Sequence, residues 1–273
     1  MLPALHARCA PHQGAEVEPR TITFDVEGHV ATITLNRPES LNSFNDDVAA
    51  EMVWAWETVR ETDDVHVVVL QANGERAFCT GADIKGGAKW FRKANVWNTF
   101  DPGVSLGPKF HHKVWKPVVV AVHGMCAGGG MYFVNEADIV VCSDDAEFFD
   151  AHANAGIVAA LEPIGMLARG VPLGDALRWA LMGTEERVTA ATALRLGLVT
   201  EVVPRAELRP RVRAIADSIA ARDPKAIQGT VRAIWESLDM THSMALQNGI
   251  AYTNIGNDYS RPFTRVNRPP EYR

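Results

Sequence analysis

The fold is decided by residues 117–130, which read PVVVAVHGMCAGGG and join an unbroken apolar run to a glycine-rich turn. An apolar run rich in valine is typical of a strand that is buried on both faces of a parallel sheet. A helical pattern at positions 131–137 begins directly after the glycines. At such a junction the backbone N–H groups that start the helix point outward without partners, and the helix dipole adds partial positive charge.

A second turn of small residues, AFCTGADIK at positions 77–85, follows another apolar run at positions 65–71. Two such turns that face each other form a pocket for an anion, either a phosphate or the oxyanion that develops on a carbonyl. Each glycine cluster taken alone is equally consistent with glycines that permit close packing of a helix on a strand.

The chain alternates between strand and helix patterns up to about residue 204. Alternating apolar residues predict a β-hairpin at positions 22–35, and Asn45 or Asp46 is placed to cap a helix that runs to about Thr62. A third apolar run lies at positions 139–141. This order of elements predicts an α/β fold whose site lies at the carboxyl ends of the strands.

After residue 204 the pattern changes to helices only, at positions 208–221, 224–236 and 240–254. Their apolar faces suit packing against something outside the sheet layer. We therefore expect a flexible leader at positions 1–20, a core that carries the site at positions 21–204, and a helical oligomerisation region at positions 205–273.

The composition argues against several classes of protein. Lys and Arg total 27 against 33 Asp and Glu, a net charge of −6, whereas nucleic acids and membrane surfaces select clustered basic residues. Four cysteines, at positions 9, 79, 126 and 142, lack the spacing of a disulfide framework or a metal site. The cysteine spacing therefore predicts no metal. Because neither a signal peptide nor a membrane span is indicated, the sequence predicts a cytoplasmic protein.

Several motifs together resemble the crotonase (enoyl-CoA hydratase/isomerase) superfamily. They are TLNRP at 34–38 with LNSF at 41–44, AFCTGADI at 77–84, the stretch 116–130, and TAATA at 189–193 with LGLV at 196–199. The resemblance implies an α/β fold with a crotonase-like ββα-superhelix (spiral) core and a C-terminal α-helical trimerisation domain. It also implies an acyl-CoA substrate, no cofactor besides the coenzyme A of that substrate, and a homotrimer or dimer of trimers.

The resemblance assigns roles to both turns. Relatives use the N–H groups at the positions of Ala82 and Gly129 to bind the thioester carbonyl and to stabilise its enolate. Lys85 is placed to reach a phosphate of coenzyme A, and a solvated surface lysine is an equal alternative. Trp90 belongs to an aromatic-rich segment, 86–115, that is either a lid over a bulky acyl group or ordinary core. The expected contacts with substrate or coenzyme A are Asp83, Ile84, Lys85, Gly128, Trp90 and Phe148.

The sequence departs from the family at both glutamates of the hydratases, where it carries Tyr132 and His152. His152 is the candidate acid or base, because its unperturbed pKa lies near working pH. Tyr132 is placed to donate a hydrogen bond, and Glu162 is either catalytic or favours the start of a helix. Asp150 is expected to point away from His152 in an extended stretch, while Glu136 is placed either to orient Tyr132 or His152 or to pair elsewhere.

These residues predict an enzyme that acts on an acyl-CoA thioester through an enolate, with His152, Tyr132 and Glu162 as catalytic residues. Because both usual glutamates are replaced, we expect a hydration, isomerisation or C–C cleavage of non-standard type. The alternative is an acyl-CoA-binding protein that has lost catalysis, which would use the same two turns for binding alone.

Overall fold

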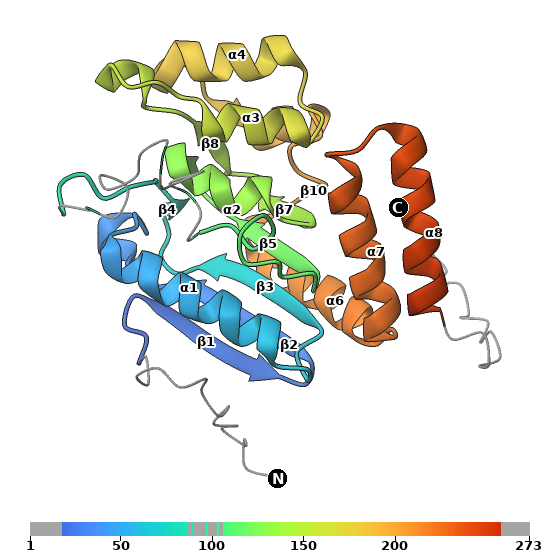
Figure 1. Ribbon diagram of the computed structural model, residues 1–273. Coiled ribbons are helices and arrows are strands. Elements are labelled where there is room, and N and C mark those ends of the chain that lie inside the picture. Colours follow the sequence, from blue (N-terminus) through green and yellow to red (C-terminus); the bar gives the residue numbers. More distant parts are fainter. Residues whose placement is uncertain (1–17, 87–88, 90–96, 98–102, 104–105, 258–273) are drawn as a thin grey trace.

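The computed structural model of the chain describes residues 18–86, 89, 97, 103 and 106–257. Most of the predicted leader, Trp90 and the tail from residue 258 lie outside the described residues. Figure 1 shows strands at the centre of the molecule, helices α3 and α4 above them, and the pair α7 and α8 to one side.

The larger sheet has six strands in the order β1-β2-β3-β5-β7-β10. Strands β1 (Ile22–Glu27) and β2 (Val30–Leu35) form the predicted antiparallel hairpin. The other strands continue the sheet in parallel; they are β3 (Val67–Ala72), β5 (Val118–Val122), β7 (Ile139–Ser143) and β10 (Glu201–Val203). The three apolar runs of the sequence are therefore neighbouring strands, β3, β5 and β7, which confirms the α/β prediction.

A smaller sheet holds four short strands in the order β4-β6-β8-β9. These strands are β4 (Ala77–Cys79), β6 (Met125–Ala127), β8 (Glu147–Phe149) and β9 (Val188–Thr189). The chain passes from β3 to β4, from β5 to β6 and from β7 to β8, so each consecutive pair gives one strand to each sheet. Because β4 and β6 pair in parallel, the segments that follow them leave the sheet side by side.

Helix α1 (Asp46–Glu61) packs its apolar stripe into the main hydrophobic core. As predicted, Asn45 caps it, accepting a hydrogen bond of 3.0 Å from the Val48 N–H, and Thr62 ends it. Its Glu51 carboxylate is buried and accepts the N–H groups of Thr21 and Ile22 at 2.9 and 3.1 Å. Glu51 thereby attaches the start of β1 to the helix.

Helix α6 (Leu208–Ala220) covers the face of the sheet opposite the main core. Val212 and Ala216 are fully buried against strand residues such as Val69 and Val119. The prediction that all three C-terminal helices pack outside the sheet layer is therefore wrong for α6. Its buried residues recur every four positions, and this narrow apolar stripe fits a flat sheet face.

Helices α7 (Pro224–Ser237) and α8 (His242–Gly256) pack on each other and contain no buried residue. The Trp235 indole N–H attaches α7 to the core by donating to the Asp138 carboxylate at 2.6 Å. Asp138 also accepts the buried Lys109 ammonium at 2.7 Å. Several apolar side chains on these two helices are exposed, among them Ile234, Leu238, Met244, Leu246, Ile250 and Ile255.

Four further helices complete the described chain: α2 (Met131–Asn135), α3 (Leu161–Ala168), α4 (Leu173–Met182) and α5 (Ala190–Arg195). Among the described helices, none combines the length and the apolar character that a membrane crossing requires.

Candidate active site

The two glycine-containing turns touch each other. Gly81 follows β4, and its φ of 82° is a left-handed conformation that favours glycine. A Cβ placed on Gly81 would lie 3.0 Å from the Gly129 nitrogen and 3.2 Å from the Ala127 oxygen. The residues on either side of this contact include Ala82 and Gly128, so the structure brings together both turns that the sequence singled out.

Phe44 fixes the first turn in place. It forms an isolated β-bridge with Ala82, and its N–H donates to the Gly81 oxygen at 2.9 Å. The Asp83 N–H donates in return to the Phe44 oxygen at 2.9 Å. The Phe44 ring also lies against Gly129, where an added Cβ would be 2.5 Å from Cζ. Phe44 therefore packs between the two turns, and a larger residue at position 129 would collide with it.

Asp83 holds the loop that follows the first turn. Its carboxylate pairs with Arg37 at 3.0 Å and accepts the Gly86 N–H at 2.6 Å. The Gly86 hydrogen bond, with the Arg37 guanidinium, holds the pKa of Asp83 below its usual value. Ile84 and Lys85 are exposed beyond it. A ligand contact of these three residues stays a prediction, and the Asp83 carboxylate is already used within the loop.

His152 lies at the second turn, and its partner is Asp150. The His152 Nδ1 is 2.7 Å from the Asp150 carboxylate, which also accepts the His152 N–H at 3.2 Å. The position of a Cβ on Gly128 is 3.8 Å from both His152 Cε1 and an Asp150 oxygen. The predicted orientation of Asp150 away from His152 is therefore wrong. The chain does not continue as a strand after β8, because His152 adopts a helical φ of −60°.

The Asp150 carboxylate sets the state of the imidazole. Asp150 is fully buried, whereas the His152 side chain is 28% exposed. The hydrogen bond that the His152 ring donates to Asp150 raises the pKa of His152 above its usual value, and the Glu162 charge adds to that effect. A carboxylate at Nδ1 holds the ring proton there, which leaves Nε2 to exchange a proton with a ligand.

Glu162 lies in the first turn of α3 and is buried. The start of this helix is attached to α2, because the Asn135 amide donates to the Glu162 backbone oxygen at 2.9 Å. The structure thus places Glu162 within electrostatic range of His152, as the effect on the His152 pKa indicates.

Tyr132 is half-buried beside the second turn. A Cβ on Gly129 would be 3.4 Å from its Cε2, and a Cβ on Gly103 would overlap its ring. The ring therefore fills the space between Gly129 and the segment around Gly103. Tyr132, Phe44 and His152 together surround the residues 128–130.

Phe148 and Glu136 both make contacts within the fold. Phe148 is completely buried in the main core, and its contact with substrate stays a prediction. Glu136 accepts the backbone N–H groups of Lys109 and Phe110 at 2.6 and 3.2 Å. Of the two roles considered for Glu136, these contacts favour pairing elsewhere.

The described cysteines are buried and unpaired: Cys79, Cys126 and Cys142. Burial raises the pKa of Cys79 and of Cys142 to about 12, so both thiols are protonated near neutral pH. Among the described residues, no group of three or more His, Cys, Asp or Glu side chains is placed to hold a metal ion.

Known proteins of one family match most of this chain. The sequence profile described as enoyl-CoA hydratase/isomerase matches residues 25–256. The (E)-benzylidenesuccinyl-CoA hydratase of Thauera aromatica is 34% identical over 86% of this chain and 88% of its own length. The short-chain-enoyl-CoA hydratase of Clostridium acetobutylicum is 32% identical over 80% of this chain and 82% of its own.

A solved structure gives the same picture for the fold. The crystal structure of an enoyl-CoA hydratase/isomerase from Mycobacterium paratuberculosis superimposes with a TM-score of 0.79 at 37% identity, covering 87% of this chain and 90% of that one.

Proposed function

Because this chain belongs to the enoyl-CoA hydratase/isomerase family, we propose that it hydrates the double bond of an enoyl-CoA thioester with His152 in place of a catalytic glutamate. The observation that carries this proposal is the Asp150–His152 pair at the second turn, with Glu162 nearby. A histidine held by one carboxylate and close to another supplies the acid and the base that hydration needs.

The thioester carbonyl is bound by the backbone N–H groups of Ala82 and Gly129. Contact between Gly81 and Gly129 supports this arrangement, since it places the two turns at one point. As the double bond is attacked, negative charge moves onto the carbonyl oxygen. One backbone donor aimed at such an oxyanion stabilises the transition state by about 2.7–4 kcal/mol.

Proton transfer is divided between the two side chains. Glu162 accepts a proton from water while the water oxygen bonds to C3, and the π electrons move toward the thioester to give the enolate. His152, protonated at Nε2, then gives its proton to C2 and completes a 3-hydroxyacyl-CoA. A proton passes from Glu162 to His152 to restore the starting state. A raised His152 pKa favours this acid role near neutral pH.

The acyl group is proposed to be bulky. The relative from Thauera aromatica is named for an acyl group that carries a phenyl ring, and residues 86–115 of this chain are rich in aromatic residues. Within that segment the Trp97 side chain is exposed, which leaves aromatic surface for an acyl chain to contact.

The strand pairs form a ββα superhelix in this proposal, and the C-terminal helices form a trimerisation domain. The alternation of strands between the two sheets supports the first part. The exposed apolar side chains of α7 and α8 support the second, because contact with neighbouring subunits would remove them from water. The proposed oligomeric state is a homotrimer or a dimer of trimers.

Turnover of a panel of enoyl-CoA thioesters tests the proposal. The panel spans short-chain, long-chain and aryl-substituted acyl groups, and loss of the enoyl thioester absorbance reports hydration. Wild type is expected to hydrate at least one member, and His152→Ala to lower kcat by about 10²–10⁴-fold. His29→Ala is the matched control, because His29 is exposed and stacks on His66.

A different result would select another function. Tight binding of acyl-CoA by calorimetry without turnover of any panel member would identify the chain as a silent acyl-CoA-binding protein. Equal turnover by wild type and His152→Ala would remove His152 from the mechanism.

A further inference from the structure

A buried asparagine ends the helix that begins at the second turn. Helix α2 follows the residues Gly128–Gly130 without a break, so Gly129 and Asn135 belong to one continuous helical stretch. The Asn135 side chain is enclosed, since only 7% of the residue is exposed. Asn135 therefore has a fixed place relative to the turn that is proposed to bind the thioester carbonyl.

Helix α3 packs on α2 (Figure 1), and Asn135 makes the contact with its first turn. The Asn135 Nδ2 donates to the Glu162 backbone oxygen at 2.9 Å. Because a carbonyl oxygen only accepts, the N–H₂ end of the amide must make this bond. Gly165 lies over the same amide, and a Cβ at that position would be 2.3 Å from Nδ2. The close approach of α3 to Asn135 therefore requires a glycine at position 165.

Other contacts hold the rest of α3. Arg169 ends the helix, and its guanidinium donates to the Ala137 oxygen at 2.8 Å. Met166 is fully buried in the main core. The Asn135 bond differs from both contacts, because it acts on the backbone of Glu162 itself. A change in this bond moves the residue whose carboxylate is the proposed base.

The amide of Asn135 is not explained by packing alone. Its Oδ1 is buried and has no hydrogen-bond partner among the residues that the structure describes. A buried polar atom of this kind destabilises the fold, so an apolar side chain would be favoured here if packing alone decided. The contact with Glu162 supplies a reason for an amide at this position.

The electrostatic effect on His152 depends on where Glu162 lies. The hydrogen bond to Asp150 raises the pKa of His152, and the charge of Glu162 raises it further. Asp150 lies two residues before His152 and is not part of α3. Of the two carboxylates that act on His152, only Glu162 therefore changes its place when α3 moves.

We propose that Asn135 is a positioning residue: its hydrogen bond to the Glu162 carbonyl, across Gly165, sets where the Glu162 carboxylate lies relative to His152. This inference rests on the proposed hydration, in which Glu162 accepts a proton from water and His152 gives one to C2. One short helix then fixes both the carbonyl site at Gly129 and the base. A displacement of about 1 Å in such a group costs about a hundredfold in rate.

Asn135→Leu is the test, because leucine keeps the branched shape of asparagine and has no donor. NMR titration of the His152 Cε1–H signal is the first readout. We expect a lower His152 pKa in the variant than in wild type, since the Glu162 carboxylate moves away. Hydration kinetics are the second readout, with kcat expected to fall by about tenfold to a hundredfold and KM to stay unchanged. An equal His152 pKa in Asn135→Leu and wild type would overturn the proposal.

A double-mutant cycle separates positioning from a loss of stability. Glu162→Gln alone should lower the His152 pKa, and Asn135→Leu should add no further change in that background. A full additional shift there would overturn the proposal. Met166→Ala is the matched control, because it removes a buried side chain of the same helix without changing the Asn135 bond. It should lower the melting temperature and leave the His152 pKa as in wild type.

The inference and the proposed function can fail separately, since the NMR titration needs no turnover. A lowered His152 pKa in Asn135→Leu supports the placement of Glu162 by Asn135, even if wild type hydrates no enoyl-CoA. Normal hydration with an unchanged His152 pKa would overturn the inference alone. If Asn135→Leu does not fold, Gly165→Ala replaces it, because the added Cβ would displace the amide. The same fall in the His152 pKa is then expected, and an unchanged value would overturn the proposal.

Discussion

Replacement of Asp150 by asparagine tests how His152 is held. Asp150→Asn keeps the shape of a fully buried side chain but removes the negative charge that lies 2.7 Å from His152 Nδ1. The amide also presents an N–H₂ group that competes for the same ring nitrogen. We expect the imidazole to lose its fixed tautomer and its elevated proton affinity, with the surrounding core unchanged.

The magnitude follows from the type of bond. A hydrogen bond to a charged group contributes about 1.5–3 kcal/mol. Because the His152 side chain is partly exposed, the lower end applies, and the variant should lower the pKa of His152 toward its usual value. The corresponding loss of acid at neutral pH, with the lost tautomer, predicts a fall in kcat of about tenfold to a hundredfold.

The assay is an NMR titration of the histidine Cε1–H signals, with the His152 signal assigned by comparison with His152→Gln. Asp64→Asn is the control, because Asp64 is exposed. A raised folded-state pKa stabilises the fold below the unfolded pKa of about 6.5, and that stability is lost as pH rises through the folded value. Asp150→Asn should therefore flatten this part of the stability profile. An unchanged His152 pKa in the variant would refute the assigned role of Asp150.

Four further predictions concern buried residues and their contacts in the fold. Lys109→Met should lower the free energy of unfolding by about 3–5 kcal/mol in urea denaturation, because it leaves Asp138 without its buried cation; an unchanged midpoint would contradict this. Gly129→Ala should lower kcat by about a hundredfold or more, since a Cβ there meets the Phe44 ring at 2.5 Å and displaces the turn; normal kinetics would count against that contact. Burial and two arginines lower the pKa of His123 to about 4, below its value of about 6.5 in the unfolded chain. Between these two pH values only the unfolded chain takes up a proton at this residue, so wild type loses stability as pH falls through that window. His123→Asn should not show this loss when the free energy of unfolding is compared at pH 7 and 4.5. Glu51→Gln should destabilise the protein by about 1–3 kcal/mol in thermal unfolding, because the carboxylate accepts the N–H groups of residues 20–22, and an equal melting temperature would argue against this anchor.

The hairpin at 22–35, the strands at 65–71, 117–122 and 139–141, and the two turns were predictable because the information is local. A run of valines specifies a buried strand, and glycines specify where the chain leaves it. Parallel pairing of β4 with β6 then brings Ala82 and Gly129 together. The cap at Asn45 was predictable for the same reason, since a cap depends on residues three positions apart.

Features that depend on the backbone path were missed. Asp150 binds His152 only because the chain turns after β8, and an extended stretch would have separated the two side chains. The pattern of an aspartate two residues before a histidine was the available signal, since an aspartate often accepts the N–H two positions later in a turn. Helix α6 was expected outside the sheet layer because the apolar faces of the C-terminal helices are rich in alanine, isoleucine and methionine.

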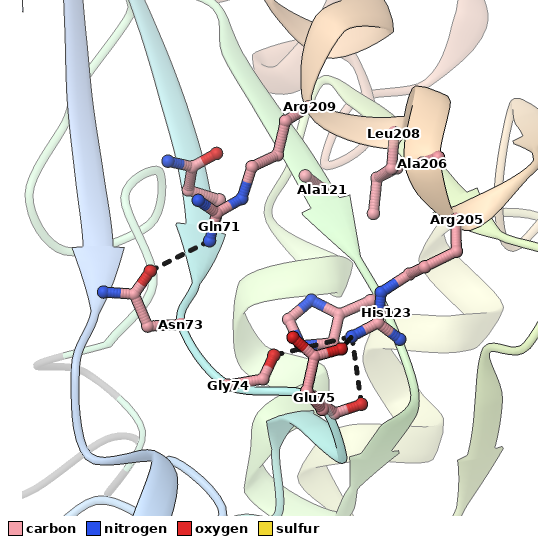
Figure 2. A pocket seen from close by; sticks show the side chains of 10 residues that line it. All are labelled: Gln71, Asn73, Gly74, Glu75, Ala121, His123, Arg205, Ala206, Leu208 and Arg209. Atoms are coloured by element: carbon pink, nitrogen blue, oxygen red, sulfur yellow. Dashed lines mark hydrogen bonds and ion pairs between the residues drawn. The ribbon is translucent and has the colours of Figure 1, made fainter.

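Contacts between distant segments were not accessible from the sequence. Lys109 and Asp138 are 29 positions apart and meet only after the strands assemble. A cavity lined by residues that include Gln71, His123 and Arg209 (Figure 2) joins three segments that span more than 130 positions of the chain, and no local pattern links them. Burial of polar groups of this kind depends on tertiary packing, which periodicity does not describe.

The most direct test of the account is exchange of the C2 protons of a saturated acyl-CoA in D₂O, followed by NMR. This exchange needs no added water and no double bond, so it isolates enolate formation and proton transfer by His152. Deuterium is expected at C2 with wild type, and a rate lower by about a hundredfold or more is expected with His152→Ala at unchanged acyl-CoA affinity. Exchange by His152→Ala at the wild-type rate, or no exchange by wild type with the acyl-CoA bound, would contradict it.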